Sequence, residues 1–321
     1  MTSARDPGYV ARLRASVAGE VRVDESLARY TTYRIGGPAT VLLAANEDDI
    51  AVAVGMSRAE GVPIFPVGLG SNLLFPDEGL DALVVRLGKG LDRVENYGPI
   101  WRLGAGLPAP LAARKTAQAG WAGLHMMVGV PGTVGGGVYM NAGCHGGEWS
   151  AVVRHVELVD SAGDRRRATA DEIPFRYRHS GLGEQIVVGV EVELTQEKHE
   201  ELEAEVEKLF EWRQKGTPFN KPCCGSVFTN PEWPEGPPAN GPRTAGQLIE
   251  ASGLKGTREG GVEISAMHAN YFVNTGGGTA SDVRRLMDVA RATVKKRFGV
   301  SLIPEVKVIA PNGSILVTRD T

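Results

Sequence analysis

The sequence is poor in cysteine and in long apolar runs, and each shortage excludes a class of protein. Its three cysteines, of which Cys223 and Cys224 are adjacent, are too few and wrongly spaced for a disulfide framework. No stretch approaches the roughly 18 apolar residues of a membrane span, and residues 1–25 contain no apolar segment of signal-peptide length. We therefore expect a cytoplasmic protein, in a reducing compartment and without a membrane partner.

The chain also carries little net charge. A formal net charge of −3 gives no overall attraction for nucleic acid, so a polyanionic ligand would need a local site. With 321 residues, of which 42% are hydrophobic, the chain can form two or three globular domains. We expect a monomer that does not bind nucleic acid.

Several catalytic motifs are absent as well. Neither of the two glycine-rich loops described below ends in the Lys-Ser/Thr of a P-loop, which disfavours a kinase or an ATPase. The pattern G-x-S-x-G is missing and no His–Asp pair can be assigned to Ser226, which disfavours a hydrolase. The adjacent cysteines have no second pair and no nearby histidine, and we expect no metal site.

Two glycine-rich stretches are the strongest positive signals. Residues 129–147 interleave glycines with Val130, Val134 and Val138, which favours buried, ordered backbone over a flexible linker. Residues 68–74 follow a predicted strand and present several backbone N–H groups on one side, which suits a diphosphate. Glycine allows backbone to approach a flat or anionic ligand closely, so both stretches indicate a ligand cradle.

Hydrophobic periodicity predicts alternating helices and strands. The expected helices span residues 47–60, 109–120, 199–212, 245–252 and 281–298, and the expected strands span residues 41–44, 62–67, 83–86, 101–103, 152–160, 185–194, 268–274 and 302–310. Residues 41–67 form one β-α-β step, and the charged helix after residue 198 opens a second domain. Ser281 is the expected N-cap of the last helix. Residues 104–109 match a dinucleotide fingerprint but lack its ribose-binding acid, so we interpret them as a tight turn.

Single side chains give weaker signals. Arg176 and Arg178 flank a tyrosine and could hold a carboxylate or an enolate, although a solvated turn would show the same pattern. Ser226 follows a glycine and is a candidate nucleophile or proton donor, or else an ordinary turn serine. Glu305 interrupts an apolar strand, and a carboxylate placed there requires a partner or a function. We interpret His268 as a core histidine.

Taken together, several segments resemble the UDP-N-acetylenolpyruvoylglucosamine reductases, flavoenzymes of peptidoglycan precursor synthesis. The matching segments are residues 33–39, 68–74, 129–147, 177–180, 225–231, 268–274 and 304–307. They occur in the order and spacing of that family across residues 28–310. The resemblance implies an α+β fold, with an FAD-binding PCMH/VAO-type fold of two α/β subdomains and a separate α+β substrate-binding domain. The implied domains are a lead-in at 1–27, an FAD-binding domain at 28–195, a substrate-binding domain at 200–300 and a C-terminal strand at 301–321 that returns to the FAD domain.

The resemblance also implies FAD and NADPH as cofactors and UDP-N-acetylglucosamine enolpyruvate as the substrate. By family position, Arg178 and Glu305 would stabilise developing negative charge, and Ser226 would donate a proton. The implied substrate-binding residues are Tyr177, Lys215, Asn230 and Lys307. The implied cofactor-binding residues are Tyr33, Arg34, Gly68, Leu69, Gly70, Ser71, Asn72, Leu73, Gly129, Pro131, Gly132, Thr133, Gly135, Gly136, Asn141, Ala142 and Gly143.

Two alternatives stay open at this point. One is an FAD-dependent alcohol or sugar oxidase of the same superfamily, and the other is a catalytically silent FAD-binding protein. Cys144, His145 and Cys223 depart from the residues usual in the family, and His145 near a flavin loop raises the hypothesis of a covalent flavin link. The short spacing after Arg178 resembles the shorter form of the reductase, which lacks the tyrosine loop that closes over substrate.

Overall fold

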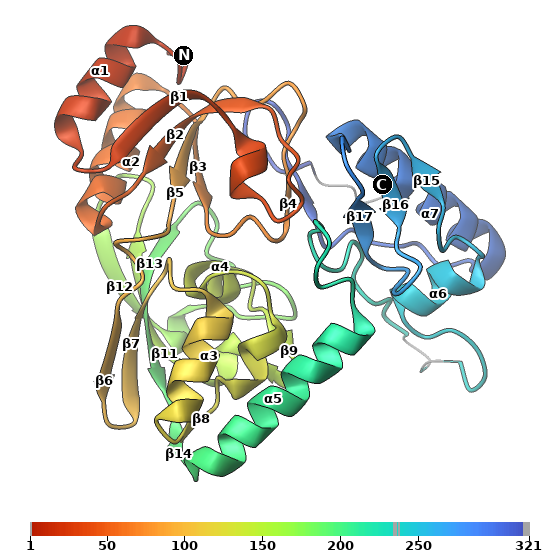
Figure 1. The fold of residues 1–321 in the computed structure, drawn as a ribbon. Helices are drawn as coiled ribbons and strands as arrows, with labels where there is room; N and C mark the ends of the chain where they lie inside the picture. Colours follow the sequence, from red (N-terminus) through yellow and green to blue (C-terminus); the bar gives the residue numbers. More distant parts are fainter. Residues whose placement is uncertain (1, 234–235, 237, 317–321) are drawn as a thin grey trace. The chain divides into compact units, whose positions relative to one another are not determined.

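The computed structural model describes residues 2–233, 236 and 238–316 (Figure 1). Residues 234, 235 and 237 of the predicted substrate-binding domain, and residues 317–321 of the predicted C-terminal segment, lie outside this description. The chain divides into two compact units. The first unit comprises Met1–Glu25, Ala39–Leu69 and Asp81–Arg213, and the second comprises Ser26–Pro38, Gly70–Leu80 and Gln214–Thr321.

Most of the secondary structure belongs to the first unit. Its elements are α1 (Pro7–Ser16), β1 (Glu20–Ser26), β2 (Pro38–Leu43), α2 (Glu47–Glu60), β3 (Ile64–Val67), β5 (Leu83–Arg86), β6 (Val94–Tyr97), β7 (Ile100–Gly104), α3 (Ala109–Gln118), β8 (Trp121–Ala122), α4 (Val134–Tyr139), β9 (Gly143–Cys144), β10 (Gly147–Glu148), β11 (Val153–Val159), β12 (Arg165–Thr169), β13 (Ile186–Glu193), β14 (Thr195–Gln196) and α5 (His199–Gly216). The last residues of α5 fall in the second unit.

The first sheet contains the predicted β-α-β step. Its strands lie in the order β1-β2-β5-β3, and β2 and β3 both pair in parallel with β5, which lies between them. The connecting helix α2 begins where the side chain of Asn46 accepts a hydrogen bond from the backbone of Asp49, and it ends at Gly61, whose φ is 68°. Both ends follow ordinary capping rules, and the predicted helix is confirmed residue for residue.

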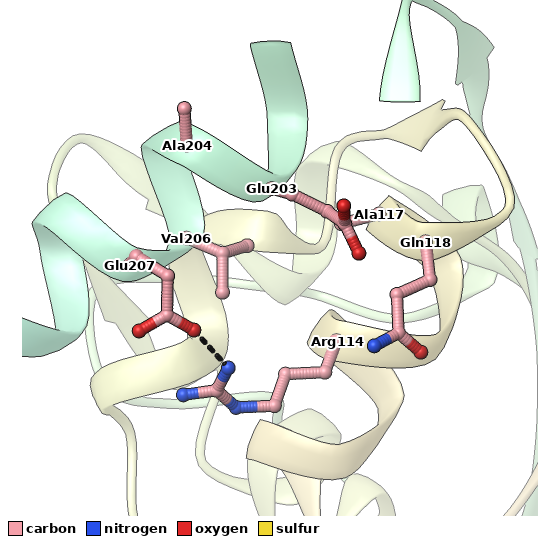
Figure 2. Close-up of a pocket in the computed structure, with 7 residues that line it drawn as sticks. All are labelled: Arg114, Ala117, Gln118, Glu203, Ala204, Val206 and Glu207. Atoms are coloured by element: carbon pink, nitrogen blue, oxygen red, sulfur yellow. Dashed lines mark hydrogen bonds and ion pairs between the residues drawn. The ribbon is translucent and has the colours of Figure 1, made fainter. Parts of the chain in front are cut away.

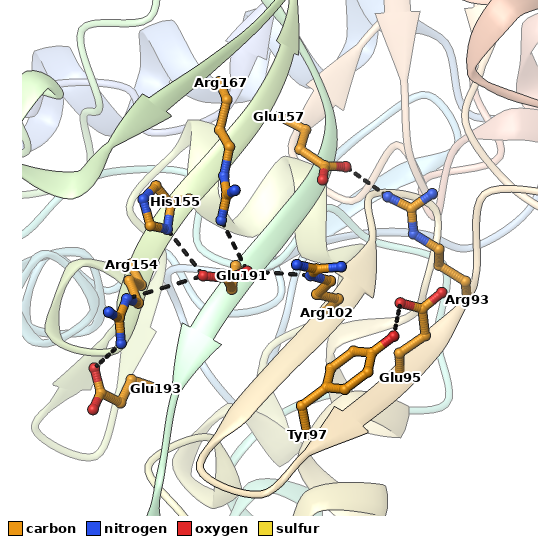
Figure 3. Close-up of polar contacts among 10 residues, drawn as sticks. All are labelled: Arg93, Glu95, Tyr97, Arg102, Arg154, His155, Glu157, Arg167, Glu191 and Glu193. Atoms are coloured by element: carbon orange, nitrogen blue, oxygen red, sulfur yellow. Dashed lines mark hydrogen bonds and ion pairs between the residues drawn. The ribbon is translucent and has the colours of Figure 1, made fainter.

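The second sheet is antiparallel, in the order β12-β11-β13-β7-β6. Val156, Val190 and Leu103 lie in register on its buried face, because successive side chains along a strand point to opposite sides. The opposite face carries a polar network centred on Glu191, shown in Figure 3, which lies within ion-pair distance of Arg102, Arg154, Arg167 and His155. β12 was not predicted, since its residues are almost all polar.

Helix α5 packs against the first unit. Its buried residues Leu202 and Val206 belong to the same hydrophobic core as Trp101 and Trp149. The sequence pattern assigned this helix to the second domain because composition changes near residue 196. The observed helix instead completes the core of the first unit, and the second unit resumes only after Arg213.

The second unit is built around a small antiparallel sheet with two helices. Its elements are β4 (Leu73–Leu74), α6 (Ala245–Ala251), β15 (Arg258–Glu259), β16 (Val262–Ile264), β17 (Phe272–Asn274), α7 (Ala280–Phe298) and β18 (Lys307–Val308). The N-cap of α7 is Thr279, not the predicted Ser281, because the Thr279 hydroxyl accepts a hydrogen bond from the backbone of Asp282 and forms a capping box.

The predicted strand at 302–310 is only two residues long. β18 pairs in parallel with β4, and both strands belong to the second unit. Pro304 has no N–H to donate to a strand ladder, which limits pairing on its N-terminal side. The partner residues Leu73 and Leu74 lie inside the predicted FAD-binding range 28–195, and the assignment of residues 301–321 to that domain stays a prediction.

Long-range hydrogen bonds connect the early segments of the second unit to its C-terminal part. The Asp77 carboxylate accepts bonds from the backbone of Ala280 and of Ser281, at 2.7 and 3.1 Å. The Asn274 side chain donates to the carbonyl of Tyr33 at 3.1 Å. These bonds keep residues 26–38 and 70–80 attached to α7 and β17. Among the described residues, we find no helix with both the length and the apolar run needed to span a bilayer.

Candidate active site

The glycine-rich stretch at 129–147 is ordered. It forms α4 and the short strands β9 and β10, and Thr133 is the N-cap of α4, with its hydroxyl accepting a hydrogen bond from Gly136 at 3.3 Å. A Cβ at Gly137 would overlap the buried indole of Trp149. The glycine is therefore required by close packing at that position.

Gly68, which begins the earlier glycine-rich loop, and Gly135 of the later stretch are both closely packed within the first unit. A Cβ at Gly68 would lie only 2.5 Å from the hydroxyl oxygen of Thr133, and one at Gly135 would lie 2.8 Å from the Cβ of Ala105. The glycines at 68 and 135 are therefore required by close packing against Thr133 and Ala105.

Arg178 lies in a tight turn after this stretch in sequence. Arg176 and His179 exchange two backbone hydrogen bonds of 2.7 and 3.0 Å across the turn. Arg178 has φ = 56°, a left-handed conformation that is unfavourable for an arginine. Its guanidinium lies 4.8 Å from the ring centroid of Tyr177, which is 60% exposed. A strained, non-glycine residue of this kind points to a functional constraint.

Three side-chain hydrogen bonds fix the turn to the glycine-rich stretch. Arg178 donates to the carbonyl of Gly143 at 2.8 Å, and the buried Asn141 donates to the carbonyl of Arg176 at 3.1 Å. Ser180 donates to the carbonyl of Tyr139 at 2.6 Å. The structure therefore brings together three of the predicted residues, Arg178, Asn141 and Gly143.

Cys144 and His145 follow directly. Burial raises the pKa of the Cys144 thiol, although the nearby Arg213 and Arg178 charges oppose this. Burial and the Arg213 charge lower the pKa of His145, which favours a neutral imidazole at pH 7. The His145 ring lies edge-on to the indole of Trp212, with centroids 4.9 Å apart. Neither thiol nor imidazole is therefore charged at this point of the loop.

The second unit carries Ser226 and Glu305 on neighbouring segments. The backbone N–H of Glu305 donates to the carbonyl of Val227 at 2.8 Å, and that of Thr229 donates to the carbonyl of Ile303 at 2.9 Å. Ser226 is half-buried and follows Gly225, whose φ of 79° suits glycine. The two predicted catalytic residues of this unit thus lie on chains held together by backbone hydrogen bonds.

Asn72 connects the early glycine-rich loop to the segment of Glu305. Its side chain donates to the carbonyl of Glu305 at 3.2 Å, and its own carbonyl accepts from the backbone of Lys307 at 2.9 Å.

The Tyr33 ring is fully buried beside Cys224. Burial and, to a smaller extent, the neighbouring thiols raise the pKa of its phenol. Tyr33 is therefore neutral and forms part of the core of the second unit.

The other predicted site residues are distributed over both units. In the first unit Pro131 and Gly136 are exposed, whereas Leu69, Gly132 and Ala142 are partly buried and Gly129 is buried. In the second unit Arg34, Lys215 and Asn230 are exposed, Ser71, Leu73 and Lys307 are partly buried, and Gly70 is buried. The Asn230 side-chain oxygen accepts a bond from the backbone of Ala245 at the start of α6, at 3.1 Å.

Comparison with known proteins identifies the family. Residues 217–309 match the family model described as the UDP-N-acetylenolpyruvoylglucosamine reductase C-terminal domain, and residues 38–169 match that of an FAD binding domain. The reductase of Halalkalibacterium halodurans is 39% identical over 303 residues, covering 94% of this chain and 98% of the relative. That of Heliobacterium modesticaldum is 40% identical over 298 residues, covering 92% of each. The crystal structure of the reductase from Thermus caldophilus superimposes with a TM-score of 0.77 at 33% identity, covering 90% of this chain and 99% of that one. The chain belongs to the UDP-N-acetylenolpyruvoylglucosamine reductase family.

Family membership confirms the predicted resemblance, and the α+β fold class is confirmed by the structure. It makes this chain an FAD-containing oxidoreductase and favours a reductase over the alternative oxidase. Gly68 and Thr133 both lie in the part of the chain matched by the FAD-binding model.

Two residues beside the reductase's glycine-rich stretch were missed from sequence. Trp212 packs on His145, and the Arg213 side chain lies 3.4 Å from the position a Cβ would take on Gly129. Both lie near the end of α5, beyond the matched FAD-binding segment. Their position follows from the helical spacing of α5, but only once Leu202 and Val206 are known to pack in the core of the first unit.

A separate pocket lies between α3 and α5 (Figure 2). It has a volume of about 330 Å³ and is lined by Arg114, Ala117, Gln118, Glu203, Ala204, Val206 and Glu207. Arg114 forms an ion pair with Glu207 at 2.5 Å, and its guanidinium lies 4.9 Å from the ring centroid of Phe210. None of the predicted site residues lines this pocket, and Arg114 is engaged with α5.

Proposed function

We propose that this protein reduces UDP-N-acetylglucosamine enolpyruvate to UDP-N-acetylmuramate, with FAD and NADPH, in peptidoglycan precursor synthesis. The observation that carries the proposal is the match of residues 38–169 to an FAD-binding domain and of residues 217–309 to the reductase's C-terminal domain on one chain. FAD, when bound and reduced by NADPH, would supply the hydride that adds to the enolpyruvyl carbon distal to the carboxylate. We further propose that the protein works as a cytoplasmic monomer.

Arg178 and Glu305 are proposed to stabilise negative charge that develops at the substrate carboxylate. A guanidinium keeps its charge at every physiological pH, and the bond from Arg178 to Gly143 fixes its direction. The strained backbone at Arg178 supports this role, because such conformations persist where function requires a fixed direction. Glu305 would contribute as a protonated or hydrogen-bonded carboxyl group.

Ser226 is proposed to donate a proton to the carbon adjacent to the carboxylate. Hydride addition leaves that carbon electron-rich, and it becomes the lactyl carbon once it gains a proton. A serine hydroxyl is a weak acid but can donate to a developing carbanion when it is held in place. The backbone bond between Val227 and Glu305 supports a fixed arrangement of Ser226, which precedes Val227, and Glu305 within the second unit.

The predicted domains and binding residues complete the proposal. Gly68, Thr133 and the other glycine-rich residues would hold the FAD diphosphate through backbone N–H groups, in the proposed domain at 28–195. Tyr177, Lys215, Asn230 and Lys307 would contact the charged groups of the substrate. The functional boundaries at residues 200–300 for substrate binding follow from the same assignment.

Anaerobic flavin spectroscopy tests the proposal. The purified, flavin-containing protein is mixed with NADPH and then with UDP-N-acetylglucosamine enolpyruvate, while the visible absorbance of the flavin is followed. Loss of the flavin colour with NADPH and its return only on adding the enolpyruvyl sugar is the expected result. Return of colour only after oxygen is admitted would point to an oxidase, and a protein whose flavin NADPH never reduces would be a silent binder.

A further inference from the structure

The backbone that follows Ser226 is bonded to one buried amide side chain, that of Asn270. The side chain of Asn270 donates to the carbonyl of Phe228 at 2.8 Å, and its side-chain oxygen accepts from the N–H of Phe228 at 3.0 Å. The carbonyl of Asn270 also accepts from the N–H of Val227 at 2.9 Å. Asn270 is 4% exposed. Its amide thus pairs with both polar groups of Phe228, as a neighbouring strand would.

The opposite side of the same two residues faces the segment of Glu305. The carbonyl of Val227 accepts from the N–H of Glu305, and Phe228 forms an isolated β-bridge with Pro304. The Phe228 ring is buried and packs edge-on to Phe272, with centroids 6.1 Å apart. Val227 and Phe228 are therefore fixed on one side by Asn270 and on the other by the chain of Glu305.

Asn270 is itself held in place. Its backbone N–H donates to Nδ1 of His268 at 3.2 Å, and Tyr271 donates to the carbonyl of His268 at 3.0 Å. A Cβ at Gly246 of α6 would lie 2.9 Å from the His268 ring, so the imidazole packs closely against that helix. The bond from the Asn270 N–H requires Nδ1 of His268 to act as an acceptor, which fits the structural role predicted for His268.

We infer that Asn270 is the positioning residue for Ser226. By pairing with Phe228 it sets the direction of the chain on which the Ser226 hydroxyl is carried, relative to the segment of Glu305. The inference rests on the proposed function, in which Ser226 donates the proton. An apolar residue at position 270 would leave the buried N–H and C=O of Phe228 without partners, and the local chain would shift to find new ones.

Two half-reactions separate positioning from general stability. Proton donation by Ser226 belongs only to the step in which the enolpyruvyl sugar reoxidises the flavin, whereas reduction of the flavin by NADPH does not need it. In the flavin-loaded Asn270→Ala protein, stopped-flow absorbance should show reoxidation slowed at least tenfold and reduction by NADPH within twofold of the wild type. The solvent deuterium isotope effect on reoxidation should also increase, because proton donation becomes more nearly rate-limiting.

Two further variants complete the test. Asn270→Asp keeps an acceptor for the N–H of Phe228 and should lose less reoxidation rate than Asn270→Ala. Thr279→Ala removes a cap in the same unit and should leave both rates unchanged. Equal loss of both rates in Asn270→Ala, or an unchanged reoxidation rate, would overturn the inference. If Asn270→Ala does not fold, the same two rates in Asn270→Asp decide. Failure of the wild type to be reoxidised by the enolpyruvyl sugar would instead overturn the proposed function.

Discussion

The glycine-rich stretch of the first unit and the Ser226 loop of the second unit shape their surroundings by opposite means. In the first, the chain is shaped by side chains that are missing, as at Gly137, where even a methyl group would overlap the indole of Trp149. In the second, the chain is shaped by a side chain that is present, the amide of Asn270. We therefore expect the glycine-rich stretch to be sensitive to added side-chain atoms, and the Ser226 loop to be sensitive to loss of the Asn270 amide.

This contrast also separates binding from chemistry. Bare backbone suits a cofactor that stays bound, because many N–H groups share the contact and none has to be a particular acid or base. Proton transfer needs one group at one place, and small displacements are costly there. The following changes would break the contrast or sharpen it, in order of decreasing expected effect.

Removing the Ser226 hydroxyl should have the largest effect. Ser226→Ala should slow reoxidation of the flavin by the enolpyruvyl sugar by about 10²–10⁴-fold, the usual contribution of a positioned acid. Flavin content and reduction by NADPH should be unchanged, since proton donation by the serine belongs only to the reoxidation step. Stopped-flow absorbance measures both rates. A variant that loses its flavin would show that the serine supports binding and would break the contrast.

Adding one methyl group at Gly68, a proposed FAD-binding residue, should affect FAD binding instead of the chemical step. Gly68→Ala should cost about 1–3 kcal/mol of unfolding free energy through overpacking against Thr133, and the protein should retain less FAD on dilution. Urea unfolding and flavin fluorescence measure the two effects. Gly55→Ala is the control. Gly55 lies inside α2, the nearest atom to its new Cβ would be the carbonyl oxygen of Ala162 at 3.8 Å, and the change should stabilise the helix by about 0.5–1 kcal/mol. Equal outcomes for the two variants would contradict close packing at Gly68.

The polar network of Figure 3 should affect stability without affecting either site. Burial alone would raise the pKa of Glu191, but hydrogen bonds from His155 and Arg102 and the charge of Arg167 outweigh it and lower this pKa. A lowered pKa in the folded state means that the stabilisation is complete above the ordinary glutamate pKa and is lost as pH falls through the lowered value. Wild-type stability should therefore fall below about pH 4.5.

Glu191→Gln should remove part of that acid sensitivity and cost about 1–3 kcal/mol at pH 7, because hydrogen bonds to a charged group are lost. Unfolding free energies measured between pH 3 and 7 test this. Glu193→Gln serves as the control, since that side chain is 58% exposed and its ion pair with Arg154 should contribute little. A steeper acid dependence in Glu191→Gln than in the wild type would contradict the lowered pKa.

The smallest effect is expected at Asp77. Asp77→Ala removes the carboxylate that accepts bonds from the first residues of α7, and should cost about 1 kcal/mol, as loss of a helix cap does. The adjacent Glu78→Ala should be neutral. Denaturant unfolding measures the difference. A loss of flavin in Asp77→Ala larger than this destabilisation predicts would show that residues 70–80 act directly in binding.

Local patterns predicted most of the helices. The acidic first turn and the terminal glycine of α2 are signals within a few residues, and its predicted bounds are those observed. The end of the chain was harder, because Pro304, Glu305 and their neighbours bond to Asn72 and Val227, far away in sequence. The predicted long strand there is replaced by β18 and these separate bonds.

The site shows the same limit. Glycine density alone indicated the stretch at 129–147, since a run of glycines has few other uses. Asn270 gave no such signal, because a buried asparagine is recognisable only when its backbone partners are known. The assignment of α5 also depended on which core receives Leu202, a question that periodicity cannot answer.

The hydrogen bonds of Asp77 can form only late in synthesis, after Ala280 and Ser281 have been made. Its partners follow it by 203 and 204 residues. At about 5–20 residues per second, a ribosome needs roughly 10–40 s to reach them after Asp77 has been made. During that interval Tyr33 and Leu74, which the finished protein buries completely, have no second-unit core to enter. The nascent chain should therefore hold these two apolar residues, one on each side of β2, without their core partners while the rest of the first unit is being completed.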